Sequence, residues 1–219
     1  MARLSSLMRK SRKAFQDLDL LKVLQSEITH ELSSNPFQDS KSASLGDFKL
    51  DWDSRHSEDV ALRKKCESGE EVAVSALLGP YTVREEDKES IFPREALMKV
   101  CIKKPGLSSI LQFDCNIHGS NVGDWSFLLI SGLHYLPLTS LDSSIYKSPP
   151  YRYEELDPSL TREIKNYLMS KGIDEGFTNF LLLHLHRKEQ GQYVNWLRKL
   201  EEMVAQGNDG ETDATSTVT

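Results

Sequence analysis

Several features of common protein classes are missing from this 219-residue sequence. Only three cysteines are present, Cys66, Cys101 and Cys115, and no pair has the Cys-x-x-Cys spacing. An odd number without that spacing argues against a disulfide scaffold and favours a reducing compartment. No apolar run approaches the roughly 20 residues that cross a bilayer, so we expect no transmembrane segment. No Asn-x-Ser/Thr acceptor for N-glycosylation occurs.

Motifs that carry chemistry are also missing. The chain has no G-x-S-x-G and no H-E-x-x-H. His184 and His186 are two residues apart, and on a helix their side chains would point about 200° apart, so they cannot share one ion. The aromatic residues are scattered rather than gathered among basic neighbours, which argues against nucleic-acid binding. We therefore expect no catalytic residue, no metal site and no cofactor, and a protein that is not an enzyme.

Charge is distributed unevenly along the chain. The net charge is -6, from 27 basic and 33 acidic residues. Five of the basic residues and none of the acidic ones lie in 1–16, so residues 17–219 hold 22 basic against 33 acidic side chains, a net of -11. An acidic body suits basic partners and repels nucleic-acid backbones. The alternative is that moderate acidity only aids solubility.

Both ends of the chain differ from its middle. Residues 1–16, MARLSSLMRKSRKAFQ, combine basic and serine residues with leucines on one helical face, which is typical of a mitochondrial import segment. A nuclear signal in MRKSRK and a plain frayed terminus are the alternatives. We expect a single domain over 17–206. The acidic, polar residues 207–219 predict a disordered tail.

Two amphipathic helices are predicted near the two ends. The first covers Asp17 to Ser33 and the second runs from Asp174 to about Gly207. The second is apolar on nearly every side over Phe177 to Leu185, and a helix of that kind needs protein all around it. Beyond it, apolar residues recur at three- and four-residue steps, Val194 among them. We predict that the two helices meet along a seam that also supports an oligomer, formed by Leu21, Leu24, Ile28, Leu32, Tyr193, Trp196, Leu197, Leu200 and Val204.

The middle of the chain has the two-residue period of half-buried strands. Alternating apolar and polar residues predict strands at 48–53, 60–65, 72–78, 96–104, 108–117 and 125–136. Pro105-Gly106 predicts a hairpin turn, and Ser131-Gly132 indicates a bulge in the last strand. Cys101 and Cys115 fall in neighbouring strands, and we interpret both as small buried hydrophobic residues.

A third helix is predicted between the strands and the last helix. Asp157 is its expected N-cap, Pro158 its first residue and Gly172 its stop. The order of elements is therefore a helix, about six or seven consecutive strands, and two helices. Helices segregated from strands indicate an α+β fold with one antiparallel sheet. One face of that sheet is covered by its own helices, and the other must meet water or a partner.

Four segments together resemble the mitochondrial glycoprotein family, and the resemblance covers about residues 17–205. They are GDFKLDWD, GEEVAVSALLGP, FPREALMKVCIKKPGLSSILQFDC and LDPSLTREIKNYLMSKGIDEGFTNFLLLHLHRKEQGQYVNWLRKLE. Members are acidic proteins of the mitochondrial matrix, including the receptor for the globular heads of a complement component. The resemblance implies a strongly twisted antiparallel sheet of seven strands, one N-terminal and two C-terminal helices, and a doughnut-shaped homotrimer. It carries over no catalytic residue.

The resemblance also implies a function. We expect a non-enzymatic, acidic, oligomeric scaffold or chaperone-like protein of the mitochondrial matrix that supports mitochondrial translation or respiratory-chain assembly. Its expected partners are further copies of itself and basic proteins or peptides, such as mitochondrial ribosomal or respiratory-chain components. The alternative is an RNA- or ribosome-associated factor that acts through two basic tips, Lys103-Lys104 and Arg63-Lys64-Lys65.

Overall fold

The computed structural model describes residues 2–34, 37, 43–81, 92–120, 126–137 and 153–209. The described residues form two compact units, one drawn from Met1–Pro36 and Gln190–Thr219 and the other from Phe37–Glu189. The elements in chain order are α1 (Ala2–Ser33), β1 (Lys49–Asp53), β2 (Val60–Lys65), β3 (Glu71–Leu78), β4 (Ala96–Lys103), β5 (Ser109–Gly119), β6 (Ser126–Pro137), the 3-10 helix η2 (Tyr153–Glu155), α2 (Pro158–Ser170) and α3 (Glu175–Asp209). None of the described helices is long and apolar enough to cross a membrane.

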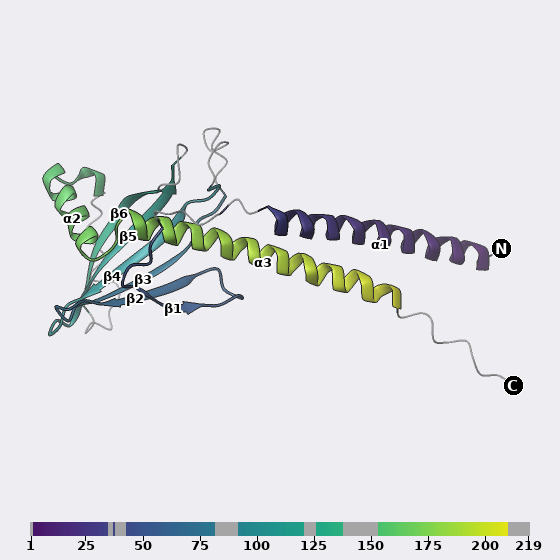
Figure 1. Ribbon diagram of the computed structural model, residues 1–219, viewed down its shortest axis with the longest axis horizontal. Coiled ribbons are helices and arrows are strands. Elements are labelled where there is room, and N and C mark those ends of the chain that lie inside the picture. The colour runs from purple at the N-terminus through teal and green to yellow at the C-terminus, as the bar shows by residue number, and fades with distance from the viewer. Residues whose placement is uncertain are drawn as a thin grey trace. The chain divides into compact units, whose positions relative to one another are not determined.

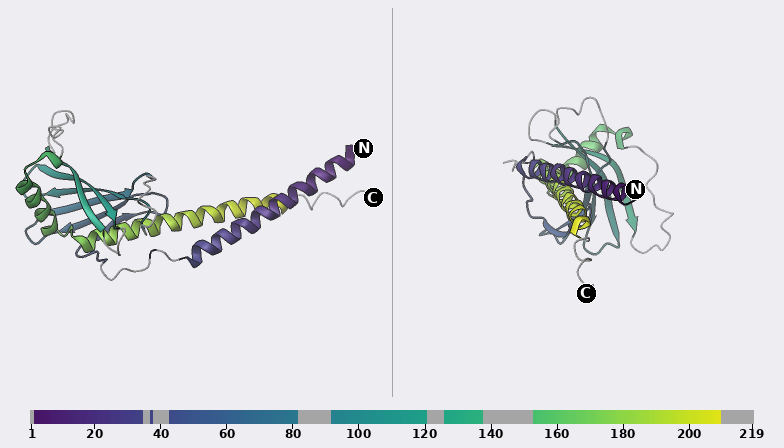
Figure 2. Two further views of the ribbon diagram at one scale, coloured as in Figure 1. Left: turned by 90° about the horizontal axis from the view of Figure 1, so that it is seen from above. Right: turned by 90° about the vertical axis from the view of Figure 1, so that its right-hand side faces the viewer.

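The strands form one antiparallel sheet in the order of the chain. Six strands pair as β1-β2-β3-β4-β5-β6, and every neighbouring pair is antiparallel. The sheet is twisted (Figure 2). The α+β class and the meander are therefore confirmed. The seventh strand stays a prediction, because part of the chain lies outside the described residues.

One face of the sheet is covered by helices. Alternate residues of β2 to β5 point inward, and α2 and the first half of α3 pack on them (Figure 1). This explains why α3 is apolar all around between Phe177 and Leu185. The core is made by Val60, Leu62, Val72, Val74, Val100, Ile102, Phe113, Ile117, Leu168, Ile173, Phe177, Leu181, Leu182 and Leu185, among others.

Two local signals for turns and bulges are confirmed. Pro105 and Gly106 occupy the centre of the β4–β5 turn, where Leu107 N donates to Lys104 O at 3.3 Å and Gly106 has a φ of 76°. A positive φ at the third turn residue is the type II geometry that favours glycine. In β6, Gly132 pairs with Asp114 and Ile130 with Cys115, so Ser131 is the extra residue of a bulge.

Strand β1 differs from its expected half-buried pattern. All five of its residues are exposed, with Leu50 at 43% and Trp52 at 54%. β1 is an edge strand, and its register shifts between Leu50 and Trp52, so that Trp52 pairs with Ala61 on the uncovered side of the sheet. Phe48, just before the strand, is buried and packs on Phe177 with ring centroids 4.5 Å apart.

Helix α2 begins and ends where the sequence predicts. The Asp157 carboxylate accepts from Ser159 N at 2.8 Å, and Pro158 is the first helical residue. At the other end Gly172 has a φ of 91°, while Ile173 N donates to Leu168 O and Gly172 N to Met169 O. This pair of bonds is the Schellman motif, which needs a left-handed residue at the position of Gly172.

The outer two helices are longer than predicted. α1 is continuous from Ala2, through the proposed import segment, to Ser33. α3 begins after Asp174, whose side chain accepts from Phe177 N at 2.9 Å, and ends at Asp209. The rest of the expected tail, 210–219, lies outside the described residues.

Candidate functional site

A hydrophobic contact joins α1 to the second half of α3. Leu24 and Ile28 of α1 are buried against Val194 and Leu197 of α3, and Leu200 and Val204 pack on the same cluster. The spacings of four residues on α1 and three on α3 place each set on one helical face. The two helix ends of the chain therefore form a small core of their own.

Polar side chains fix the direction of this helix pair. Gln190 Nε2 donates to Glu31 O at 3.1 Å, Tyr193 Oη to Glu27 Oε1 at 3.2 Å, and Gln25 Nε2 to Glu201 Oε1 at 2.9 Å. Partners later in α3 lie earlier in α1, so the helices are antiparallel. Desolvation, and then the Glu27 carboxylate, raise the pKa of the Tyr193 hydroxyl.

Not all nine predicted seam residues take part in this contact. Leu24, Ile28, Leu197, Leu200 and Val204 do, and Leu21 is half-buried. Leu32, Tyr193 and Trp196 lie outside the apolar cluster and are exposed by 60%, 38% and 53%, and of these three Tyr193 reaches α1 through its hydroxyl group.

The helical period explains why some of the predicted residues lie outside the contact and why Val194 lies within it. Adjacent helical residues point about 100° apart, so Trp196 and Leu197 cannot face the same partner helix. Trp196 stacks on Tyr193 instead, with ring centroids 6.0 Å apart. Val194 was left out of the seam, although its spacing of three from Leu197 could have identified it. A role of these residues in an oligomer stays a prediction.

His184 and His186 serve different neighbours, as their spacing indicates. His184 Nε2 lies 2.9 Å from Asp53 Oδ2, and Lys188 Nζ donates to Asp53 Oδ1 at 2.6 Å. Burial alone would raise the pKa of the Asp53 carboxyl, but the hydrogen bonds from Lys188 and His184 outweigh it and lower the pKa. These contacts tie the end of β1 to α3.

His186 is buried between two aromatic rings. It is 1% exposed, its Nδ1 lies 2.8 Å from Leu182 O, and its ring centroid is 5.2 Å from those of both Phe37 and Phe92. Burial lowers the pKa of the imidazole. The neutral ring thus acts as a packing residue that holds Phe37 and Phe92 on α3.

A buried ion pair between Glu70 and Lys171 joins the β2–β3 hairpin to the end of α2. The Glu70 carboxylate accepts from Lys171 at the end of α2 and from Ser68 Oγ at 3.1 Å, and Lys104 Nζ lies 3.7 Å away. Glu70 is 8% exposed. The hydrogen bond from Lys171 lowers the pKa of Glu70, and the same bond raises the pKa of Lys171. The charged pair locks α2 onto the β2–β3 hairpin.

The uncovered face of the sheet brings the two predicted basic tips together. In the strand register, Lys65 pairs with Glu71 and Glu71 with Lys103, while Lys49 pairs with Arg63 on the same face. A hollow of about 530 Å³ lies over these rows. It is lined by Asp47, Lys49, Asp51, Arg63, Lys64, Lys65, Glu71, Val72, Ala73, Cys101, Lys103 and Ile110.

The two neighbouring cysteines lie on opposite faces. Cys115 is buried, and burial raises the pKa of its thiol to about 12. Cys101 is only half-buried, which corrects the expectation that both are core residues. In β4 the inward positions are Met98, Val100 and Ile102, so Cys101 must face the open side. Within the described residues, no three His, Cys, Asp or Glu side chains are grouped closely enough to hold a metal ion.

Comparisons with solved structures support the fold. A Leishmania major protein of unknown function, described as a sequence homologue of human p32 protein, superposes with a TM-score of 0.62 at 18% identity. The match covers 86% of this chain and 99% of that one. At this identity the likeness concerns the fold alone.

Sequence comparisons identify the family. An uncharacterized mitochondrial protein of Arabidopsis thaliana is 25% identical over 198 residues, which are 85% of this chain and 74% of that protein. The mitochondrial acidic protein mam33 of Schizosaccharomyces pombe is 26% identical over 127 residues, 54% of this chain and 47% of that protein. The model of the mitochondrial glycoprotein family, MAM33, matches residues 24–204. The matched range begins at Leu24 in α1 and ends at Val204 in α3. This chain therefore belongs to the mitochondrial glycoprotein family.

Proposed function

We propose that this chain is a non-enzymatic, oligomeric binding protein of the mitochondrial matrix, a scaffold or chaperone-like factor for basic proteins and peptides. In this proposal 1–16 is the import segment, 17–206 the working domain and 207–219 an acidic tail. The mitochondrial names of its Arabidopsis and Schizosaccharomyces relatives support the location. Support of mitochondrial translation or of respiratory-chain assembly would follow from which basic proteins it binds.

The observation that carries the choice of partner is the charge of the chain after its first 16 residues. A net charge of -11 over 17–219 attracts cationic chains and speeds their encounter. Part of it lies on α1, where 17–33 hold four acidic side chains, Asp17, Asp19, Glu27 and Glu31, against one basic side chain, Lys22. Asp19 is exposed, and the other three are partly exposed. Electrostatic binding of this kind weakens as salt screens it over about 8–10 Å.

A second observation supports an oligomer. Among the side chains that the structure describes, the α1–α3 contact buries four large ones, and further apolar ones, Val23, Leu32, Trp196 and Met203, are exposed by 53–75%. Exposed apolar groups of this size commonly mark an interaction surface. We propose that copies of this chain cover them in a homotrimer.

The test is affinity capture of the tagged protein from isolated mitochondria at low and at high salt. We expect basic matrix proteins to be enriched at about 50 mM salt and largely released at about 500 mM. Equal capture at both concentrations would contradict an electrostatic scaffold. Enrichment of acidic proteins would contradict the proposed partner class.

A further inference from the structure

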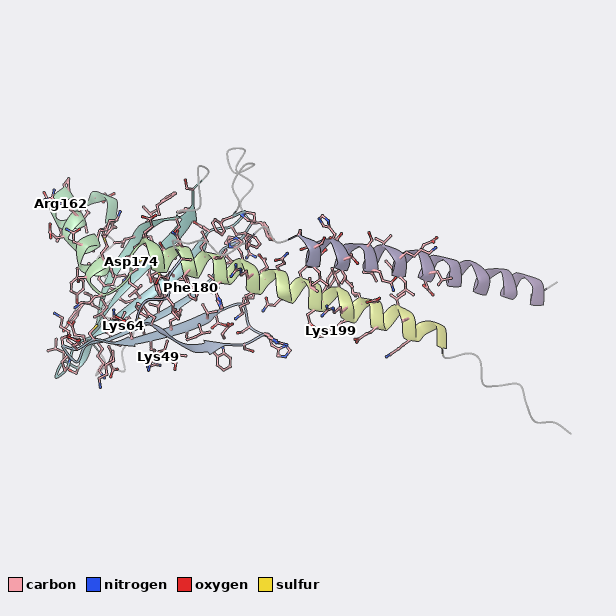
Figure 3. All side chains as sticks on the ribbon, in the orientation of Figure 1. Lys49, Lys64, Arg162, Asp174, Phe180 and Lys199 are labelled. Carbon is pink, nitrogen blue, oxygen red and sulfur yellow. The ribbon has the colours of Figure 1, made fainter. Side chains whose placement is uncertain are left out.

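We propose that the open face of the sheet binds a small organic phosphate in the hollow between Lys49, Lys65 and Lys103. This site is separate from the proposed protein-binding function, and neither depends on the other. Figure 3 labels Lys49 on β1 and Lys64 on β2, two of the residues that line the hollow.

The strand register builds the site. One row across the sheet is Lys49, Arg63, Ala73 and Cys101, and the next row is Lys65, Glu71, Lys103 and Ile110. Within a row neighbouring residues lie about 4.8 Å apart, and two successive rows on one face lie about 6.8 Å apart, a distance that a lysine side chain can span. The basic groups stand on strands β1, β2 and β4, while Ala73, Cys101 and Ile110 supply an uncharged floor.

The charges in the hollow do not cancel. Its lining holds five basic and three acidic side chains. Two pairs are formed, because Arg63 Nε lies 2.6 Å from Asp51 Oδ2 and Lys64 Nζ lies 3.1 Å from Asp47 Oδ2. Throughout the described residues, Lys49, Lys65 and Lys103 make no ion pair or side-chain hydrogen bond. Three ammonium groups thus face only Glu71, an excess of two positive charges.

This excess stands out because the chain as a whole is acidic. Two buried cationic groups of the sheet unit are each held by a carboxylate, Lys171 by Glu70 and Lys188 by Asp53. An excess of two positive charges matches a phosphate monoester, which carries about -1.5 to -2 near pH 7. Lysine binds phosphate as a point charge without strict geometry.

The dimensions favour a small molecule over a nucleic-acid strand. A hollow of about 530 Å³ lies within the roughly 300–1,000 Å³ typical of small-ligand sites. Strand binding relies on many phosphate contacts and on stacking aromatics. Here three free amines are available, and the floor residues Ala73, Cys101 and Ile110 are not aromatic. The uncharged floor suits the organic body of the ligand, and the lysines suit its phosphate.

The test is calorimetric titration of the full chain with adenosine 5′-monophosphate in about 50 mM salt. Adenosine and inorganic phosphate are the comparison ligands. We expect the nucleotide to bind more tightly than either comparison ligand. Adenosine lacks the phosphate that the lysines contact, and inorganic phosphate lacks the organic body that the uncharged floor contacts. The double variant Lys65→Gln/Lys103→Gln should weaken binding at least tenfold, about the loss of one charge-assisted hydrogen bond. Glu71→Gln should tighten it, since the competing charge is removed.

Two controls separate the site from general electrostatics. Lys165→Gln removes an exposed lysine of α2 outside the hollow and should leave binding unchanged. The nucleotide should also slow alkylation of Cys101, measured by peptide mass spectrometry, without protecting Cys66. The proposal is overturned if no binding occurs at millimolar nucleotide or if inorganic phosphate binds as tightly. It is equally overturned if the lysine variants have no effect, or if a single-stranded RNA oligonucleotide binds through these lysines while the nucleotide does not.

Discussion

At the scale of single residues, the Glu70–Lys171 pair is the clearest buried charge interaction. The Glu70 and Lys171 side chains are 10% and 16% exposed, so each largely desolvated charge is stabilised mainly by the other. Breaking a buried pair by removing one partner costs about 3–5 kcal/mol, because the other charge stays buried without compensation. We expect Glu70→Gln to lower the free energy of unfolding by about 3 kcal/mol at pH 7, measured by urea denaturation. Glu163→Gln, at an exposed glutamate of α2, should change it little.

The same pair predicts a pH dependence with a definite sign. The folded state lowers the pKa of Glu70 from its ordinary value of 4.5. Its contribution is therefore full above about pH 4.5 and is lost as the pH falls toward the folded pKa. The stability difference between the wild type and Glu70→Gln should be largest near pH 7 and should shrink below pH 4.5. A difference that stays constant from pH 7 to pH 3 would contradict the charged pair.

Two glycines, Gly172 in the turn after α2 and Gly191 within α3, should respond in opposite ways to replacement by alanine. Gly172 has a φ of 91°, and an added Cβ would lie 3.0 Å from Lys64 Nζ and 3.3 Å from Phe48 Cε2. A left-handed backbone costs an L-residue roughly 1–2 kcal/mol, so Gly172→Ala should destabilise by about that amount. Gly191 lies within α3 with open space around it, and Gly191→Ala should stabilise by about 0.5–1 kcal/mol. Thermal unfolding of both variants tests this, and a shift of the same sign in both would contradict it.

At the scale of elements, local patterns predicted most of the fold. Two-residue alternation located β2 to β6, and Asp157, Pro158, Gly172 and Pro105-Gly106 located the ends and turns. These signals are reliable because each is decided by a residue's own backbone preference or by burial of one face. β1 was misjudged because its environment depends on being at the edge of the sheet and on a register shift that its own residues do not encode.

The contacts between distant elements were predictable only in part. The pairing of α1 with α3 followed from the apolar stripe on each helix. The predicted set of α3 residues, however, combined two neighbouring faces of that helix, one with Leu197 and one with Trp196. The ion pairs of Glu70 with Lys171 and of Asp53 with Lys188 join residues 101 and 135 positions apart. Polar side chains carry no periodic signal of their partner, so such pairs emerge only from the folded chain.

Leu197 and Trp196 lie on different faces of α3, so replacing each by alanine should affect the α1–α3 contact differently. Leu197 is 3% exposed in the contact with α1, whereas Trp196 is 53% exposed. Replacing a buried leucine by alanine costs about 2–5 kcal/mol, so Leu197→Ala should loosen the helix pair. Hydrogen exchange of the α1 amides around Leu24 and Ile28 should then accelerate by at least tenfold. Trp196→Ala is the matched variant, and equal acceleration in both would show that the exposed face also holds α1 within the chain.

At the scale of the whole molecule, two kinds of contact have different physical causes and should be separable. Apolar side chains such as Trp196 and Met203, exposed in a single chain, are proposed to be covered by other copies. The acidic charge of 17–219 is proposed to bind basic partners. Hydrophobic association does not weaken when salt is added, whereas attraction between exposed charges does.

The chain without its first 16 residues should show this difference directly. Light scattering should give the mass of a trimer at micromolar concentration, unchanged between about 50 and 500 mM salt. Over the same range its affinity for a lysine-rich peptide should fall by at least tenfold. Trp196→Asp places a charge on the exposed apolar face and should reduce the mass toward that of a monomer. The circular dichroism spectrum should not change and the α1–α3 contact should persist, because Leu197 and not Trp196 holds that contact. A wild-type monomer, or a Trp196→Asp variant of unchanged mass, would mean that the exposed aromatic pair faces something other than a second copy.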